Sequence, residues 1–326
     1  MADDSQGTET RKKRPTFERV RFDLRPAKSI ERKMLCELFR RLSALSPLDR
    51  YRYVGMGSTY FSDFSLFHKA LGIEDMVSIE REVQSRARFE FNCPYRCVRF
   101  EFGESTSVLS RLTWEAPTIL WLDYDGKLTR DILGDIKHAA AKAGAGSVLT
   151  VTVNAHPDQG AKATLRKLKD RVGEDKIPID VKPKALLLWG LATVCRRIVV
   201  NEIEETLRQR NAGLKDADRL RFKQLVHFHY RDTAYMMTVG GILYQDANAS
   251  EIEKCAFHQL RFFRDGAEAC RIEVPCLTYR EIRGLDTLLP CDDPDDFVGF
   301  DWLPSDDVKS YALIYRYFPI FTETEM

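Results

Sequence analysis

The sequence lacks the long apolar runs, the paired cysteines and the excess of one charge that mark several classes of protein. No stretch approaches the roughly 18 consecutive apolar residues of a membrane helix, and residues 1–15 contain no apolar segment typical of a signal peptide. We therefore expect a cytosolic protein without a membrane segment. Lys and Arg number 50 and Asp and Glu 49, so net charge does not indicate a nucleic-acid partner, although the basic run 11–14 leaves a local contact open.

The eight cysteines form no C-x-x-C pair. The two that lie closest, Cys93 and Cys97, have no partner pair at zinc-site spacing, so we expect free thiols. The chain has 326 residues, of which 44% are hydrophobic and 30% charged, so it can bury a core without disulfides or a structural metal. This composition also excludes disorder over most of the chain.

Short β-rich runs alternate with helical stretches over the first two thirds of the chain. Strands are predicted at 51–54, 76–79, 98–102, 118–122 and 147–153, and helices at 61–71, 82–91, 128–143, 161–172 and 184–210. An earlier helix is predicted to begin at Ser29 as its N-cap and to end near residues 46–47. Residues 224–244 indicate a β-hairpin. The alternation predicts an α/β fold with five parallel strands, closed by this antiparallel hairpin.

The chain divides into three parts on this interpretation. Residues 1–24 are predicted to be a flexible basic tail, 25–245 an α/β core, and 246–326 a C-terminal extension packed on the core. The aromatic run 311–321 in this extension is interpreted as a packing seam. No feature of the sequence predicts the oligomeric state.

Polar residues follow the first three predicted strands, at the edge where an open parallel sheet binds ligands. Gly55, Gly57 and Ser58 form a G-x-G turn, in which glycine lets a ligand approach the backbone and frees N–H groups. Glu80 ends the second strand, where a carboxylate can accept hydrogen bonds from both ribose hydroxyls of an adenosine ligand. Glu104 follows the third strand, where it can reach an adenine amino group or serve as a turn residue.

The fourth and fifth predicted strands end at residues suited to acid–base chemistry. Asp123 is the first polar residue after an apolar run, and His156 lies at the mouth of the same crevice, so either can act as general base. Asp123, Asp125 and Asn154 also form a possible set of ligands for a divalent cation. The alternative is that Asp123 fixes the amino group of a cofactor, Asp125 caps a turn with Gly126, and Asn154 caps the next helix.

These motifs together resemble a class I S-adenosylmethionine-dependent methyltransferase, whose fold is a Rossmann-like sheet. The segments 25–35, 53–73, 78–82 (SIERE) and 120–126 (LWLDYDG) more narrowly resemble a bacterial family of predicted O-methyltransferases. The resemblance implies S-adenosylmethionine as cofactor, with Gly55, Gly57, Glu80 and Glu104 at cofactor positions and Asp123 in the methyl-transfer crevice. One departure is that Tyr53 and Val54 replace the acidic residue that usually precedes the glycine turn.

The function predicted from this resemblance is methyl transfer from S-adenosylmethionine to an oxygen acceptor that the sequence does not identify. The altered end of the first strand and the C-terminal extension also fit a methyltransferase-fold protein without turnover, acting as a binding partner in a bacterial defence or modification system. Arg25 and Lys28, before the first helix, are candidates to close over a cofactor or to bind an anionic substrate. His68 is interpreted as a packed helix residue, and His227 and His229 as neighbours on one face of a strand.

Overall fold

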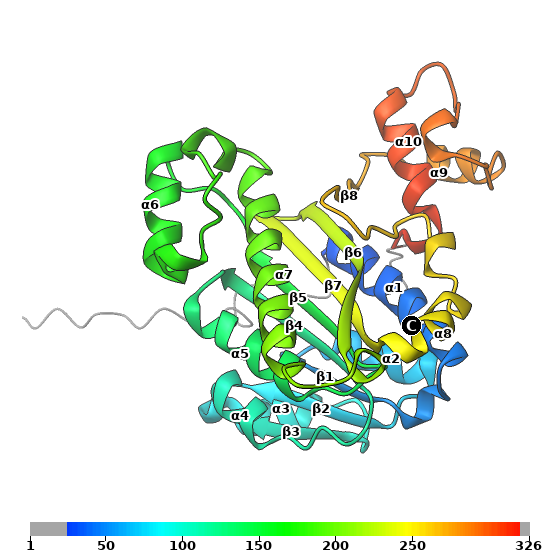
Figure 1. Ribbon diagram of the computed structural model, residues 1–326. Coiled ribbons are helices and arrows are strands. Elements are labelled where there is room, and N and C mark those ends of the chain that lie inside the picture. The colour runs from blue at the N-terminus through cyan, green and yellow to red at the C-terminus, as the bar shows by residue number, and fades with distance from the viewer. Residues whose placement is uncertain (1–24, 320–326) are drawn as a thin grey trace, which may run out of the picture.

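The computed structural model describes residues 25–319, so the predicted basic tail lies outside the described residues. One mixed sheet of eight strands runs through the molecule in the order β3-β2-β1-β4-β5-β7-β6-β8 (Figure 1). The strands are β1 (Arg52–Gly55), β2 (Asp75–Glu80), β3 (Val98–Phe102), β4 (Thr118–Lys127), β5 (Val148–Asn154), β6 (Leu220–Arg231), β7 (Tyr235–Gln245) and β8 (Cys270–Ile272).

The first five strands are parallel, and β7 pairs antiparallel with both β5 and β6. This confirms the predicted Rossmann-like sheet closed by a hairpin. Since β6 is antiparallel to β7, it runs in the same direction as β1 to β5, and the carboxyl ends of all six strands meet at one edge. The three-residue strand β8 pairs in parallel with β6 and was not predicted, because so short a run carries no readable alternation.

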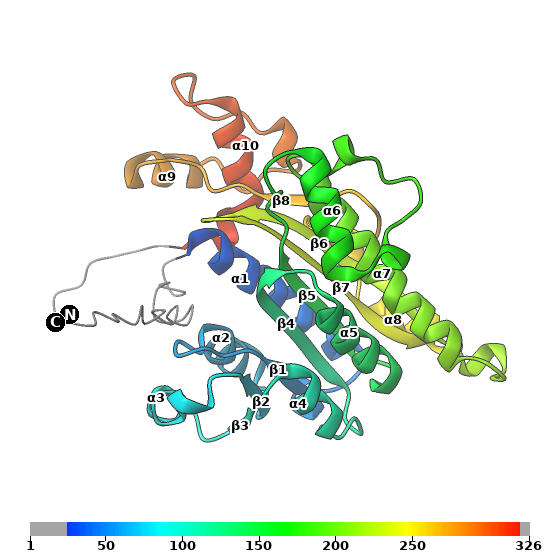
Figure 2. The ribbon, with the colours of Figure 1, turned by 90° about the vertical axis from the view of Figure 1, so that its left-hand side faces the viewer.

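Helices cover both faces of the sheet (Figure 2). One face carries α1 (Pro26–Arg40), α2 (Ser62–Leu71) and α3 (Arg86–Asn92), whose apolar side chains pack with Tyr53, Trp121 and Phe228. The other carries α4 (Ser105–Arg111), α5 (Arg130–Lys142), α6 (Ala161–Val172) and α7 (Gly190–Arg210), which pack on the opposite sides of the same strands. The β-branched run of β5 is buried between the two layers, as its composition predicts.

Four predicted boundaries are wrong. Helix α1 begins at Pro26 rather than after Ser29, because proline suits the first helical turn and Asp232 binds the free N–H groups there. It ends at Arg40 and gives way to a 3₁₀ turn. Strand β4 continues past residue 122, since the chain pairs with β5 again after a bulge. Helix α7 starts six residues later than predicted, after a 3₁₀ turn and Leu188 with φ 50°.

The C-terminal extension contains α8 (Ala249–Lys254), α9 (Tyr279–Asp286) and α10 (Ser305–Ile314). Helices α9 and α10 enclose a small separate core, and Figure 1 shows them standing beyond β8 at the margin of the sheet. Tyr317, just after α10, donates a hydrogen bond to Glu37 of α1, and its ring packs edge-on against Phe262. None of the described helices is both long and apolar enough to cross a membrane.

Candidate active site at the carboxyl edge of the sheet

The glycine turn after β1 and the acid at the end of β2 meet through hydrogen bonds. The Gly57 N–H donates to Ser78 Oγ at 3.1 Å, and that hydroxyl donates to Glu80 Oε1 at 2.7 Å. Burial raises the pKa of Glu80 to about 7, while the Ser78 hydroxyl and the N–H groups of Gly57 and Ser58 act in the opposite direction. The structure thus brings Gly57, Ser58 and Glu80 together, as the sequence led us to expect.

Both glycines of the turn are required by the packing of the protein itself. A β-carbon at Gly57 would lie 2.6 Å from the Phe61 ring and 2.7 Å from Ser78 Oγ. A β-carbon at Gly55 would overlap the Tyr53 hydroxyl. The turn can therefore hold its backbone N–H groups in this position only with glycine at both sites.

Glu104 lies at the N-terminus of α4, where its side chain is exposed and forms a 2.8 Å ion pair with Arg81. It makes no side-chain capping bond to the helix. The turn that carries it is tied to the end of β2 by a hydrogen bond from Gly103 N–H to the Glu80 carbonyl. The Glu104 side chain therefore does not cap α4, and the turn that carries it lies next to the end of β2.

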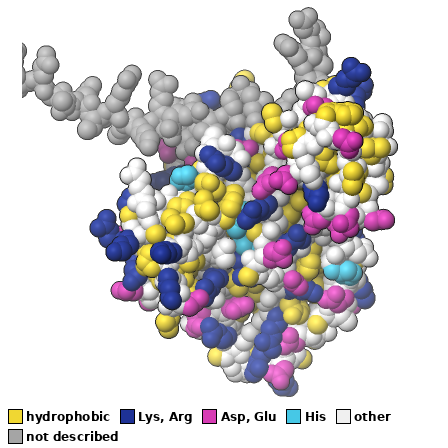
Figure 3. Space-filling view, turned by 90° about the horizontal axis from the view of Figure 1, so that it is seen from above, with side chains coloured by type: hydrophobic (Ala, Val, Ile, Leu, Met, Phe, Trp, Pro, Cys, Tyr) yellow, Lys and Arg dark blue, Asp and Glu magenta, His cyan; other side chains and the backbone are white. Residues whose placement is uncertain are grey.

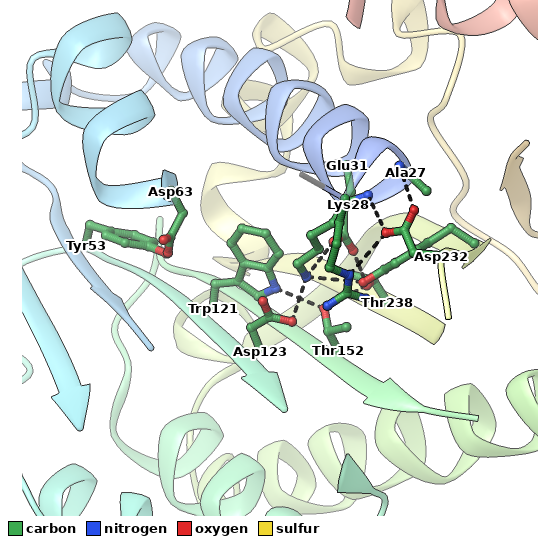
Figure 4. Close-up of polar contacts among 12 residues, drawn as sticks. Ala27, Lys28, Glu31, Tyr53, Asp63, Trp121, Asp123, Thr152, Asp232 and Thr238 are labelled. Carbon is green, nitrogen blue, oxygen red and sulfur yellow. Dashed lines mark hydrogen bonds and ion pairs between the residues drawn. The ribbon is translucent and has the colours of Figure 1, made fainter. Parts of the chain in front are cut away.

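A buried group of charges lies where α1 crosses the end of β4 (Figure 4). Lys28 is 1% exposed, and its Nζ lies 2.6 Å from both Glu31 Oε2 and Asp123 Oδ1. The same ammonium group lies 4.4 Å from the centre of the Trp121 ring, within range of a cation–π interaction. Lys28 is thus a core residue bound to two carboxylates, and it does not extend over the crevice as one hypothesis had it.

Hydrogen bonds extend this group across three strands. Thr238 of β7 donates to Glu31 and is joined to Thr152 of β5 at 2.7 Å, and Thr152 accepts from the Trp121 indole N–H at 3.0 Å. Burial raises the pKa of Glu31, and the Lys28 charge opposes this rise. Glu31 was not predicted from the sequence, although its spacing of three residues from Lys28 on an otherwise apolar helix face indicates an ion pair.

Tyr53 occupies the position in β1 where the sequence departs from the methyltransferase pattern. Its hydroxyl donates a short hydrogen bond to Asp63, a buried carboxylate in the first turn of α2 (Figure 4). Burial raises the pKa of Asp63, and the positive charge of Arg32 opposes this. Asp63 therefore places a carboxylate next to the glycine turn from a helix instead of from the strand, and it too was missed.

The possible metal ligands do not form a site among the described residues. Asp123 binds Lys28, and Asn154 Oδ1 accepts a hydrogen bond from the His156 N–H at 2.9 Å, so Asn154 caps a local turn and not the next helix, α6, whose N-cap is Gly160. Asp125 is exposed near the bulge of β4. Within residues 25–319, no cluster of three or more His, Cys, Asp or Glu side chains is arranged to hold a metal ion.

The histidines differ in their surroundings. His156 is exposed after β5, with its ring 5.2 Å from that of Tyr235. His68 is a packed helix residue, as predicted, with Nδ1 2.9 Å from the Ile73 carbonyl. His227 and His229 are buried side by side on β6, with ring centres 4.6 Å apart. Of these four, His156 is the one whose side chain is exposed at the carboxyl edge of the sheet.

Comparisons with solved structures give only distant likenesses. Trm1 from Pyrococcus horikoshii, solved with S-adenosyl-L-methionine, is 11% identical with a TM-score of 0.43, over 69% of this chain and 57% of that one. This chain thus spans little more than half the length of Trm1. The O-methyltransferase TomG from Streptomyces achromogenes, solved with the same cofactor, is 16% identical with a TM-score of 0.36, over 64% of this chain and 79% of that one.

A family model gives the stronger result. No curated protein sequence matches the chain. A model described as "Putative O-methyltransferase" matches residues 20–326, which include the C-terminal extension as well as the sheet. The chain therefore belongs to this family of O-methyltransferases.

Proposed function

We propose that the protein transfers a methyl group from S-adenosylmethionine to an oxygen acceptor at the carboxyl edge of its sheet. The observation that carries this proposal is the buried Glu80 carboxylate, joined to the Gly57–Ser58 turn beside Asp123 on β4. Family membership supports the reaction class. All eight cysteines are free thiols, which supports a reducing compartment such as the cytosol.

The carboxylates and backbone N–H groups at this edge fit a ligand that combines an adenosine with a positive charge. In this proposal Glu80 accepts hydrogen bonds from the ribose hydroxyls, the backbone of Gly55, Gly57 and Ser58 lies along the cofactor, and Glu104 receives the adenine amino group. Asp63 supplies the carboxylate that β1 lacks, and we assign it to the amino group of the methionine moiety. S-adenosylmethionine, when bound, supplies a methyl group made electrophilic by its sulfonium.

We assign proton removal from the acceptor to His156 in preference to Asp123. Asp123 is already engaged in a 2.6 Å ion pair with the buried Lys28 ammonium, whereas the His156 ring has no such partner among the described residues. His156 is exposed at the end of β5, the strand next to β4. Asp123 then contributes a fixed negative charge next to the positive sulfonium.

The test is calorimetric titration of S-adenosylmethionine into the wild type, Glu80→Gln and a matched control, Glu82→Gln. Loss of charge-assisted hydrogen bonds at Glu80 is expected to weaken binding by about 1.5–3 kcal/mol, roughly 10- to 150-fold. Glu82 lies just past the end of β2, where removal of its charge should leave the affinity within about twofold. A wild type that does not bind the cofactor refutes the proposed function. Equal affinity of Glu80→Gln and wild type refutes the assigned ribose contact.

Methyl transfer itself is measured with radiolabelled S-adenosylmethionine and a pool of hydroxyl- and carboxyl-bearing compounds. Label that appears in an ester or ether product, and is lost in His156→Gln, supports the proposal. Cofactor binding without transfer to any acceptor in the pool contradicts the enzymatic function and favours a binding protein with this fold.

A further inference from the structure

A cavity of about 890 Å³ lies between the sheet and the C-terminal extension. Its walls are the start of α7 at Trp189 and Gly190, the end of β6 at His229, the segment 261–273, and the first part of α10 with the loop before it. This volume is in the range of small-molecule sites, about 300–1,000 Å³. None of the residues assigned to the cofactor lines it.

One side of the cavity is aromatic. The ring of His229 stacks on that of Trp189, with centres 4.8 Å apart and planes 12° from parallel. Trp189 in turn meets Tyr235 edge-on at 4.5 Å, and Tyr235 lies 5.2 Å from His156. A continuous series of four rings thus leads from the cavity to the histidine that we assign to proton removal.

His229 also has an unused hydrogen-bonding atom. It is 4% exposed, and its Nε2 has no hydrogen-bond partner among the described residues. Burial lowers the pKa of His229 to about 3, so the imidazole is neutral and adds no positive charge to the cavity. A buried polar atom without a partner is uncommon in native proteins, and here it belongs to a ring that lines the cavity.

The charged lining of the cavity is predominantly acidic. Six carboxylates line it against four cations, and none of the six forms an ion pair with a described residue: Glu268, Glu273, Asp292, Asp293, Asp295 and Asp306. Two of the four cations are engaged elsewhere, since Arg261 donates to the Cys291 carbonyl and Arg264 to the Phe263 carbonyl. Figure 3 shows side chains of both signs on the upper face, without a continuous field of Lys and Arg. This lining favours a positively charged ligand.

The register of the sheet sets the distance from this cavity to the proposed reaction site. Asp123 is level with Thr152 of β5, Thr152 with Thr238 of β7, and Thr238 with Phe228 of β6, the neighbour of His229. Three strand spacings separate β4 from β6, or about 14 Å. Asp123 faces the α1 side and His229 the α7 side, so a molecule that joins the two must pass over the sheet edge beside Tyr235 and His156.

We propose that this cavity binds a cationic amine or guanidinium group of the methyl acceptor, at least about 14 Å from the oxygen that is methylated. The inference rests on the proposed function, because it takes the carboxyl edge as the site of transfer. It defines the acceptor as an elongated molecule with a basic group at one end and a hydroxyl or carboxyl group at the other. Trp189 then offers an aromatic surface to the cation, and the carboxylates of both walls neutralise it.

The experiment uses spermidine as the cationic probe and inorganic phosphate as the anionic one, in calorimetric titrations of the full chain. The cleft variant, named for this cavity, combines Glu273→Gln in the segment 261–273 with Asp292→Asn in the loop before α10, both exposed carboxylates. The control variant combines Asp296→Asn with Asp301→Asn, two exposed carboxylates of the extension that do not line the cavity. Each variant loses two negative charges. A difference in spermidine affinity between them therefore reports contacts within the cavity and not the net charge of the protein.

Spermidine is expected to bind the wild type and the control variant alike, and to bind the cleft variant about tenfold more weakly. Equal weakening in both variants, absence of spermidine binding, or tighter binding of phosphate than of spermidine would each overturn the inference. S-adenosylmethionine affinity is measured in the same samples and should not change in either variant. A failure of the amine site with intact cofactor binding therefore leaves the proposed function standing, while a wild type that binds no cofactor refutes that function separately.

Discussion

Replacing Lys28 with methionine tests the buried charge group that joins α1 to the sheet. Methionine fills a similar volume but leaves Glu31, which is 0% exposed, without its cation. Removing one partner of a buried ion pair usually costs about 3–5 kcal/mol of stability. With a urea m-value of roughly 3 kcal/mol per molar, the midpoint of unfolding should fall by about 1–1.7 M.

The loss in Lys28→Met should depend on pH in a defined direction. Burial already raises the Glu31 pKa above its ordinary value of 4.5, and loss of the Lys28 charge raises it further. A carboxyl group with a raised folded-state pKa binds its proton more readily in the folded protein. Stability of the variant should therefore be highest below about pH 4.5 and fall as pH rises through the folded-state pKa, by up to about 1.4 kcal/mol per pH unit.

The assay is urea unfolding followed by circular dichroism at several pH values between 5 and 9. The control is Lys28→Met combined with Glu31→Gln, which removes both charges and keeps an oxygen that can accept from Thr238. This double variant should regain most of the lost stability, and its midpoint should lack the added pH dependence. A loss below 1 kcal/mol in Lys28→Met, or a loss that is the same at pH 5 and pH 9, would refute the reasoning.

Three further predictions concern the proposed active site. Burial raises the Glu80 pKa to about 7, and the ribose hydroxyls would bond to its ionised form. Cofactor affinity should therefore fall by up to about tenfold per pH unit as the pH drops below 7. Titrations should show this fall in the wild type and a flat profile in Glu80→Gln, whereas a flat wild-type profile would count against the contact. His156→Gln should lower the rate of methyl transfer by about 10²–10⁴-fold and leave cofactor affinity within about twofold. Asp123→Asn should lower the rate less. A larger loss of rate in Asp123→Asn than in His156→Gln, measured in single-turnover assays, would assign the base to Asp123. Gly57→Ala should displace the turn, because its β-carbon would lie 2.6 Å from the Phe61 ring; we expect loss of cofactor binding with α-helical circular dichroism retained, and unchanged binding would contradict the packing argument.

The part of the site that the sequence predicted is the part made by strand ends. A buried strand has to stop being apolar where it leaves the sheet, so Glu80 and Asp123 mark the ends of apolar runs that can be read directly. The parallel order then places both at one edge, and their neighbourhood follows from topology. The positions of the glycine turn and His156 follow from the same rule.

The contacts that the sequence did not predict all join distant segments. Lys28 and Asp123 are 95 residues apart, and no local pattern pairs them. Asp63 was not predicted, because the methyltransferase pattern places an acid in β1, whereas here Tyr53 of β1 donates a hydrogen bond to an acid on helix α2. The cavity beside His229 could not be predicted for a similar reason, since it lies between segments from residues 189–313 whose packing only the tertiary structure defines.

The capping of α1 by Asp232 has a consequence for how the chain is made. Asp232 Oδ1 accepts a hydrogen bond from the Ala27 N–H at 3.0 Å, across 205 residues of sequence. At a synthesis rate of about 5–20 residues per second, the ribosome needs about 10–40 s to add those residues. Helix α1 must therefore wait for the β6–β7 turn before Asp232 can accept hydrogen bonds from its first N–H groups. During that interval the first turn of α1 lacks its cap, so the helix reaches its final form only after the hairpin has been made.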